Sequence, residues 1–591
     1  MDGTTGVPRW ARYLPGLHVL IHYRISWLRW DFLAGVTVLA YLVPQVMAYA
    51  AIAGLPAITG LWAIVLPLAL YAVVGPSRQL SVGPESTTAL MTAAGVGALV
   101  GATGGARYAD VAAVLALAVG LLAILGWVAR MSFLANLLSQ PVLSGYLTGI
   151  AVLMILSQLG KVTRLEIDGE NPAAVIRSTV GQLPDAHLPT VALAVAVLVT
   201  LFAFRRWAPK WPGPLLAMLA AAAVTALLDL DEDGIATIGR VPEGLPALSL
   251  PTFTDMHLVT LFPYALGIAV VGFSDNVVTS RAFAARRRDP VDSGQELLAL
   301  GLINVGSAVM HGFPVSSSAS RTVIGDAMGS RTQLHSLVAL AGVIATLLFL
   351  GPVLSSFPMA ALGSVVIYAA VRLIDVPEWR RIGRFRRSEL VLAGATATSV
   401  LVFGVLAGIG IAVALSLLDL IRRMAHPHDG VLGYVPGYAG MHDVDDYPQA
   451  VRVEGLLVYR YDSPLFFANA EDFITRAMSA VDTAERPVTW FVLNAEANVE
   501  VDLTAVDTLD LLREALAARG IVFAMTRVKQ DLRDQLRAAG FMGKVGEERI
   551  FLTLPTAVAA YAAWYADRNG GPPPGLPDNL PPVGGTLPNG T

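Results

Sequence analysis

The chain has 591 residues, of which 55% are hydrophobic and only 15% are charged, and its formal net charge is −4. Soluble domains usually have about 25% charged residues, so this composition excludes an ordinary soluble enzyme and favours a protein with many membrane-spanning helices. The chain has no cysteine, which excludes disulfides, thiolate metal sites and cysteine nucleophiles.

The first 30 residues are predicted to be a cytoplasmic segment. Arginines lie among tryptophans and tyrosines here, as in Arg24 and Trp27. The opening residues 1–5 lack a basic stretch followed directly by an apolar core, so we expect no cleavable signal peptide.

Apolar runs then recur from about residue 31 to residue 425, and this region is the predicted transmembrane domain. Fourteen spans account for it, and their predicted ranges are 31–53, 58–75, 80–99, 109–129, 132–158, 188–205, 213–230, 258–281, 293–311, 315–330, 333–351, 353–373, 388–405 and 407–424. An even number of spans places both termini on one side of the membrane.

Charge supports this arrangement independently. The loops predicted on the side of the termini carry basic clusters, namely Arg205-Arg206 with Lys210, Arg281 with Arg286-Arg287-Arg288, Arg380-Arg381 with Arg384 and Arg386-Arg387, and Arg422-Arg423. An opposite loop carries Asp229, Asp231, Glu232 and Asp233. Because Lys and Arg collect on the cytoplasmic side, we expect both termini to be cytoplasmic.

Two of the predicted spans contain matching interruptions. The first is Val82-Gly83-Pro84-Glu85-Ser86-Thr87, and the second runs from Gly312 to Arg321 with the sequence GFPVSSSASR. Each places glycine and proline in mid-span and continues as a hydroxyl-rich helix. Non-helical backbone at membrane depth is tolerated only where protein buries it or it lines a wet cavity. Two such half-helices are typical of the anion site of a secondary transporter.

The last third of the chain has the composition of a small soluble domain. A linker is predicted over 426–447, a domain of alternating strands and helices over 448–566, and a disordered tail over 567–591. The predicted strands are 451–459, 488–493 and 521–524, and a helix is predicted near 505–519.

Several motifs together resemble the SulP anion-permease family, also called solute carrier family 26. These are Pro56-Ala57-Ile58-Thr59-Gly60-Leu61-Trp62, Pro44-Gln45, Gln295-Glu296-Leu297, Ser320-Arg321-Thr322 and Leu432-Gly433-Tyr434-Val435-Pro436-Gly437. The resemblance covers nearly the whole chain, and the C-terminal domain resembles a STAS domain.

The resemblance implies a fold and a class of activity. The fold is an α-helical polytopic membrane domain with fourteen segments in two inverted seven-helix repeats, arranged as core and gate, followed by a cytoplasmic α/β STAS domain. The family also implies small anions as substrates, a plasma or inner membrane location and a homodimer.

Asp275 is the candidate for cation coupling. A charge at bilayer depth costs about 2.5–3.5 kcal/mol on insertion scales, so it needs a partner or a proton. Thr279 lies one helical turn further along and adds an oxygen ligand for Na⁺. At the matching positions, sodium-coupled family members carry Asp and Thr, but they have a hydroxyl where this chain has Ala319, which leaves H⁺ and Na⁺ both open. The alternative is that Asp275 pairs with a buried arginine.

Eight residues are candidates for binding the anion, in three groups along the chain. They are Gln45, Tyr49, Glu85, Ser86, Ser318, Ala319, Ser320 and Arg321. Hydroxyls and free N–H groups suit an oxyanion, whose oxygens all accept hydrogen bonds. The alternatives are close packing for the serines, Gln45 and Tyr49, and an ion pair with Glu85, Asp275 or Asp326 for Arg321. Glu85 is also open as a second proton site.

Thr504 matches the position of the phosphorylated serine in single-domain STAS proteins, so it is a candidate regulatory site. The competing interpretation is a simple helix N-terminus on a dimer or regulator surface. The STAS partner is not predicted.

The predicted function is secondary active transport of a small inorganic anion, with sulfate uptake coupled to H⁺ or Na⁺ first, bicarbonate second and C4-dicarboxylates third. An uncoupled exchanger or channel and a membrane-anchored STAS scaffold are the rival classes. No Gly-x-x-x-x-Gly-Lys-Ser/Thr loop, metal-ligand cluster or nucleophile–base pair is present, so we expect no enzyme activity, no cofactor and no nucleic-acid partner.

Overall fold

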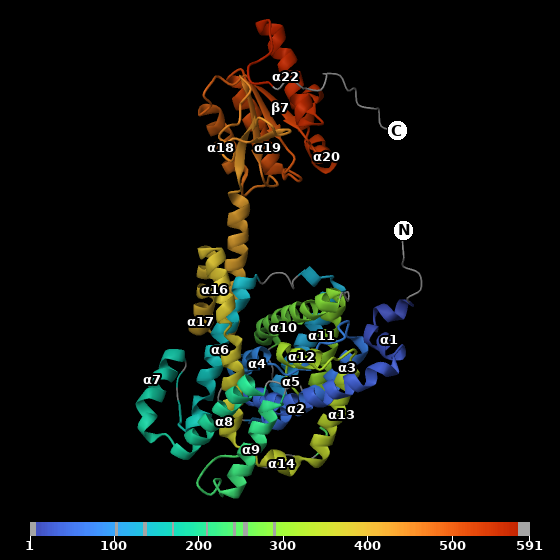
Figure 1. Ribbon diagram of the computed structural model, residues 1–591, viewed down its shortest axis with the longest axis vertical. Coiled ribbons are helices and arrows are strands. Elements are labelled where there is room, and N and C mark those ends of the chain that lie inside the picture. Colours follow the sequence, from blue (N-terminus) through green and yellow to red (C-terminus); the bar gives the residue numbers. More distant parts are fainter. Residues whose placement is uncertain are drawn as a thin grey trace. The chain divides into compact units, whose positions relative to one another are not determined.

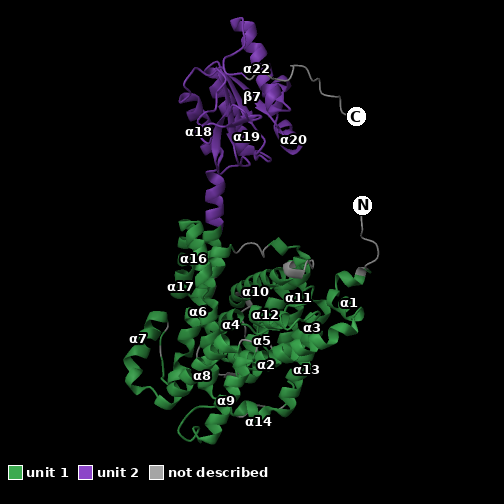
Figure 2. Ribbon diagram, in the orientation of Figure 1, with its two compact units in different colours: residues 1–416 green, residues 417–591 purple. Residues whose placement is uncertain are grey.

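The computed structural model describes residues 8–100, 105–133, 139–167, 169, 171–208, 211–239, 244–246, 248–251, 258–287 and 291–576. Residues 1–7, part of the fifth predicted span (134–138), Lys210, Arg288 and the last residues of the predicted tail (577–591) lie outside the described residues. The chain divides into two compact units, residues 1–416 and 417–591 (Figures 1 and 2).

The first unit is helical. Its helices are α1 (Pro15–Ile21), α2 (Leu28–Ile52), α3 (Ala57–Val74), α4 (Ser86–Val100), α5 (Gly105–Val128), α6 (Gln140–Thr163), α7 (Pro172–Gln182), α8 (Leu188–Trp207), α9 (Gly213–Leu227), α10 (Leu258–Arg287), α11 (Ser293–Val309), α12 (Ala319–Ala327), α13 (Leu334–Phe349), α14 (Gly351–Ser355), α15 (Met359–Leu373), α16 (Val376–Phe385) and α17 (Arg387–Ala425). Short 3-10 turns cover Arg9–Arg12, Ile25–Trp27 and Leu183–Asp185.

Eight helical stretches within the described residues are long and apolar enough to cross a membrane. Three shorter apolar helices, α4, α9 and α13, add to them. The helical membrane domain is as predicted, whereas the count of fourteen spans and their inverted repeat remain predictions. The helix α7 was not predicted.

Breaks in the helices fall near two of the predicted span boundaries. The helix α17 covers the last two predicted spans, and Gly404 interrupts it with a φ of 81° and a ψ of 174°. This conformation is open to glycine because it has no Cβ. Residues 351–355 form a separate short helix, α14, so the predicted span 353–373 begins instead at Met359.

The second unit has a six-stranded sheet in the order β4-β3-β5-β6-β7-β8. The strands are β3 (Asp429–Tyr434), β4 (Met441–Asp443), β5 (Leu456–Tyr461), β6 (Trp490–Asn494), β7 (Val522–Thr526) and β8 (Ile550–Phe551). The helices are α18 (Ala470–Asp482), α19 (Leu503–Ala518), α20 (Gln530–Ala538), α21 (Phe541–Val545) and α22 (Leu554–Asn569), with a 3-10 turn at Glu547–Arg549. Strands β5 to β8 are parallel, and β3 is antiparallel to β5.

Both faces of this sheet are covered, which explains why β6 is buried along its whole length. Successive residues of β5 point to opposite faces: Leu457 and Tyr459 pack with α18 to α21, whereas Leu456 and Val458 pack with α22. The alternating α/β domain is therefore as predicted.

The structure corrects two boundaries of this unit. The predicted linker 426–447 contains β3 and β4, which are strands of the sheet. The predicted tail begins too early, because α22 extends to Asn569 and the Glu454 N–H donates to the Pro574 carbonyl. The glycine- and proline-rich sequence of these two segments predicted neither the strands β3 and β4 nor the contact at Pro574. Both depend on partners that are distant in the sequence.

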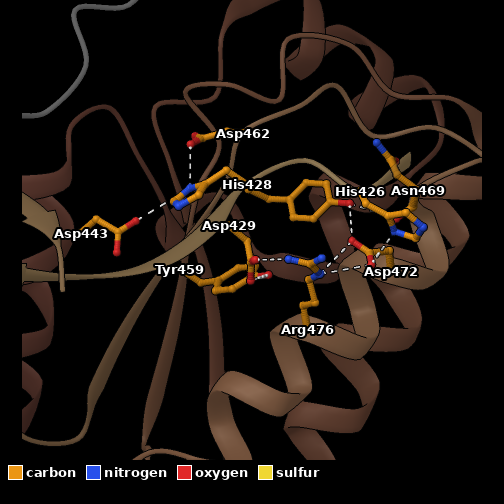
Figure 3. Close-up of polar contacts among 10 residues, drawn as sticks. His426, His428, Asp429, Asp443, Tyr459, Asp462, Asn469, Asp472 and Arg476 are labelled. Atoms are coloured by element: carbon orange, nitrogen blue, oxygen red, sulfur yellow. Dashed lines mark hydrogen bonds and ion pairs between the residues drawn. The ribbon is translucent and has the colours of Figure 1, made fainter. Parts of the chain in front are cut away.

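A charged cluster joins the beginning of this unit to α18 (Figure 3). His426 Nδ1 and Arg476 Nε lie 3.0 and 3.1 Å from Asp472 Oδ1, and the Tyr461 hydroxyl donates to Asp472 Oδ2 at 3.0 Å. Burial opposes ionisation of this carboxyl, but the hydrogen bonds and the Arg476 charge outweigh it and lower the pKa of Asp472.

We predict that Asp472→Asn destabilises the C-terminal unit by about 1–3 kcal/mol at pH 7. A carboxyl with a lowered folded pKa stabilises the fold above its unfolded pKa, and this contribution is lost as the pH falls through the folded pKa. The difference between variant and wild type should therefore shrink below about pH 4. Denaturation of residues 417–591, followed by circular dichroism, measures it. Asp534→Asn is the control, because Asp534 pairs with Arg537 in an exposed contact worth little. Equal losses in both variants would contradict the prediction.

Candidate functional site

The two interruptions predicted from the sequence pair with each other in the first unit. They form two short strands, β1 (Val82–Gly83) and β2 (Ser316–Ser317), which are antiparallel and fully buried. Helix α4 begins at Ser86, and helix α12 begins at Ala319. Both helices therefore begin within three residues of the same two-stranded sheet.

Hydrogen bonds satisfy the backbone on both sides of this sheet. The Ser318 N–H donates to the Ser81 carbonyl at 2.8 Å, and the Ser81 N–H donates to Thr322 Oγ1 at 3.0 Å. Arg321 Nη1 donates to the Pro84 carbonyl at 3.1 Å. Each interruption thus supplies the partners that the other one needs.

Neighbouring helices supply further partners through amide side chains. Asn276 of α10 accepts from the Ser317 N–H at 2.7 Å. Asn304 of α11 accepts from the Val315 N–H and donates to the Val315 carbonyl, both at 2.9 Å. These contacts fix β2 between α10 and α11.

Gly83 is required by close packing at the first interruption. Its φ is +140°, and a Cβ there would lie 2.5 Å from Ile64 Cδ1 and 3.3 Å from Arg321 Nη2. A larger residue would adopt this φ with strain and would clash with the Ile64 side chain.

Arg321 is fully buried, and its guanidinium has capacity left for a ligand. Its Nε lies 3.4 Å from Ser81 Oγ and its Nη1 binds Pro84, but its buried Nη2 has no hydrogen-bond partner among the described residues. The predicted alternative of an ion pair is not found in the described part of the chain, where no carboxylate lies within 4.0 Å of this guanidinium. Other polar atoms at the interruptions that are buried without a partner in the same residues are Ser316 Oγ, Ser317 Oγ and Asn276 Nδ2.

Six of the predicted site residues are gathered here. Tyr49 of α2 lies close enough to Glu85 and Arg321 for electrostatic interaction and also lies near Ser86. Asp275 of α10 interacts electrostatically with Glu85. Asp275 and Glu85 are half-buried, and neighbouring Ala319 is exposed, so the starts of the two half-helices reach accessible surface.

The other predicted residues are less directly connected. Ser318 Oγ lies 3.1 Å from Ser320 Oγ at the start of α12. Gln45 is buried one turn from Tyr49, and its Oε1 has no partner in the described residues. Thr279 is half-buried one turn from Asp275, and no hydrogen bond joins the two side chains. Thr504 lies exposed in the first turn of α19, where Asp502 caps the Ala505 N–H at 2.8 Å.

Sequence reasoning missed the residues that hold the interruptions together, namely Ser81, Asn276, Asn304 and Thr322. Polar amides in the middle of apolar spans were the available signal, because a buried amide needs partners. The described residues contain no group of three or more His, Asp or Glu side chains that could bind a metal ion.

The fold is similar to that of a solved anion transporter. The structure of the murine Solute Carrier 26 family member A9 anion transporter in the inward-facing state matches with a TM-score of 0.85 at 20% identity, covering 96% of this chain and 97% of that chain. This likeness shows that the two chains share a fold over nearly their whole lengths.

Curated relatives match along most of their length. A protein of Mycobacterium tuberculosis (strain CDC 1551 / Oshkosh), named probable sulfate transporter MT1781, is 56% identical over 551 residues, covering 93% of this chain and 98% of its own length. The chloroplastic sulfate transporter 4.1 of Arabidopsis thaliana is 30% identical over 565 residues, covering 93% of this chain and 82% of its own length.

Two family models match in succession. The model described as the STAS domain matches residues 447–557, and the model described as the sulfate permease family matches residues 28–396. With paired half-helices inside the matched region and relatives named as sulfate transporters, the chain belongs to the sulfate permease family.

Proposed function

We propose that this protein is a secondary active transporter that takes up a small inorganic anion, with sulfate as the leading substrate, in symport with H⁺ or Na⁺. The observation that carries the proposal is the meeting of two half-helix N-termini beside Arg321 Nη2, which has no hydrogen-bond partner among the described residues. Two relatives named as sulfate transporters support sulfate as the substrate.

An oxyanion suits these groups because each of its oxygens accepts hydrogen bonds. One helix N-terminus contributes about 0.3–1 kcal/mol to anion binding, and up to about 2 kcal/mol when partly buried. Two termini alone would hold a dehydrated divalent anion weakly. The buried charge of Arg321 supplies the additional attraction, and the hydroxyls of Ser86, Ser318 and Ser320 add donors.

Asp275 is proposed as the coupling residue. Its side chain is half-buried and interacts electrostatically with Glu85, so ionisation of both carboxyls would place two negative charges at the proposed anion site. A proton or a Na⁺ on Asp275 relieves this repulsion, which makes cation binding and anion binding mutually favourable. Thr279 would add an uncharged oxygen to a Na⁺ site.

We further propose that the protein lies in the cell membrane as a homodimer with both termini and the STAS domain in the cytoplasm. The one-sided basic loops support this orientation. The STAS domain would then present exposed Thr504 to a cytoplasmic regulator.

Bicarbonate and C4-dicarboxylates remain alternative substrates, because their oxygens suit the same donors. An uncoupled exchanger or channel is the alternative mechanism. A signalling scaffold without transport is the rival class, and the buried Arg321 Nη2 that has no partner among the described residues argues against it, because a purely structural arginine would not need a spare donor.

We predict that Asp275→Asn removes the stimulation of uptake by both pH and Na⁺ gradients. The amide keeps the size of the side chain but cannot gain a proton or neutralise a cation. Uptake of radiolabelled sulfate into proteoliposomes, with each gradient imposed separately, measures this effect, and sulfate–sulfate exchange reports whether the variant still binds substrate. Gradient-driven uptake that survives the substitution would contradict coupling through Asp275.

We also predict that Arg321→Gln weakens sulfate binding by about tenfold to a hundredfold, the equivalent of one charged hydrogen bond. Arg321→Lys should restore part of the affinity, because lysine keeps the charge but cannot bind Ser81 and Pro84 simultaneously. Equilibrium binding of labelled sulfate to the purified proteins measures the loss. Size-exclusion profiles control for folding. Unchanged affinity in both folded variants would contradict an anion site beside Arg321.

A further inference from the structure

Glu85 occupies the N-terminal end of α4 with its own side chain. It is the residue before the first helical residue, Ser86, and its carbonyl accepts from the Ala89 N–H at 2.9 Å. Unlike the neighbouring residues 80–84 and 86–89, which are all buried, Glu85 is half-buried. Its carboxylate therefore lies at the accessible side of the helix start.

This carboxylate takes donors that an anion would use. The Thr87 N–H donates to Glu85 Oε2 at 2.7 Å, and the Ser86 hydroxyl donates to Glu85 Oε1. The first-turn amides of a helix have no partner within the helix, and this is why they attract anions. In α4 a negatively charged group of the protein already fills that position.

Titratable groups of four helices interact with this carboxylate. Tyr49 of α2 and Arg321 of α12 interact with Glu85 electrostatically. So do Asp275 of α10 and Tyr146 of α6. Arg321 is the one cation of this set, and it makes no ion pair with Glu85 in the described residues. Its Nη2, which finds no partner in the part of the chain that the structure describes, gives the same place a second, independent attraction for an anion.

We infer that Glu85 is a tethered competitor of the transported anion, so that the substrate must displace this carboxylate from the Thr87 N–H and the Ser86 hydroxyl in order to bind at α4. The inference rests on the proposed function, because it assigns the helix start to the anion. It makes Glu85 a residue that sets the apparent affinity by competing with the substrate rather than by contacting it.

Competition between Glu85 and the anion predicts the direction in which a substitution of Glu85 changes the anion affinity. A residue that helps to bind the anion loses affinity when it is replaced, whereas a residue that occupies the site gains affinity. Removing the charge at Glu85 also removes repulsion toward the incoming anion, and this acts in the same direction. Tethering keeps the competitor at the site at any sulfate concentration, so its effect appears as a higher dissociation constant.

The test is equilibrium binding of radiolabelled sulfate to the purified full-length protein, comparing wild type with Glu85→Gln and Glu85→Ala. Gln keeps the shape of the side chain without its charge, and Ala frees both donors. We expect both substitutions to lower the dissociation constant by about twofold to thirtyfold, the factor that corresponds to one interaction at a helix terminus. Glu85→Asp keeps the negative charge and should not produce this gain.

Glu296→Gln is the matched control. Glu296 of α11 is another buried carboxyl of the same unit, and it accepts a hydrogen bond from the Tyr71 hydroxyl at 2.9 Å. Removing its charge should leave the dissociation constant unchanged within about twofold. A gain of affinity in this control equal to that of Glu85→Gln would show a general charge effect and overturn the inference.

Different results would overturn the role of Glu85 and the proposed transport function. If the wild type binds sulfate and the folded Glu85 variants bind it equally or more weakly, the carboxylate is a structural cap and the inference is wrong, while the proposed function stands. If the wild type binds none of sulfate, bicarbonate or a C4-dicarboxylate, the proposed function fails and the inference fails with it.

Discussion

The pairing of β1 with β2 is the contact on which the rest of the membrane unit depends. A helix that stops in mid-span exposes N–H and carbonyl groups that lipid cannot satisfy, and each such group costs several kcal/mol. Neither interruption can solve this problem alone. Ser81 bonds to Ser318 and Thr322, and Pro84 bonds to Arg321, so each interruption is stable only in the presence of the other.

Arg321 stabilises the paired interruptions and is also the cation of the proposed anion site. One part of its guanidinium holds the first interruption in place, and the remaining nitrogen Nη2 is left as a buried donor. A buried charge without a counter-ion is costly, and this is why we propose that an anion binds beside Arg321. Glu85 and Asp275 oppose that preference nearby. In the proposed mechanism, anion entry therefore depends on a cation or a proton that neutralises these carboxyls.

The sequence predicted the elements of the site better than their connections. Glycine, proline and serine at 82–87 and 312–321 marked both interruptions, because those residue types break helices and bind polar groups. The partnership of Ser81 with Thr322 spans 241 residues, and no local pattern encodes it. The same limit applies in the second unit, where β3 was predicted as part of a linker because its strand character depends on pairing with β5. The buried strand β6, whose apolar run is local, was predicted directly.

The position of the bound anion tests this account most directly. An experimental structure of the protein with selenate, a heavier analogue of sulfate, would locate the anion by its anomalous scattering. We predict a selenate between the first turns of α4 and α12, within hydrogen-bond distance of the Thr87 N–H or Arg321 Nη2, with the Glu85 carboxylate moved away from α4. Selenate bound elsewhere in the membrane unit, with Glu85 still on the Thr87 N–H, would contradict it.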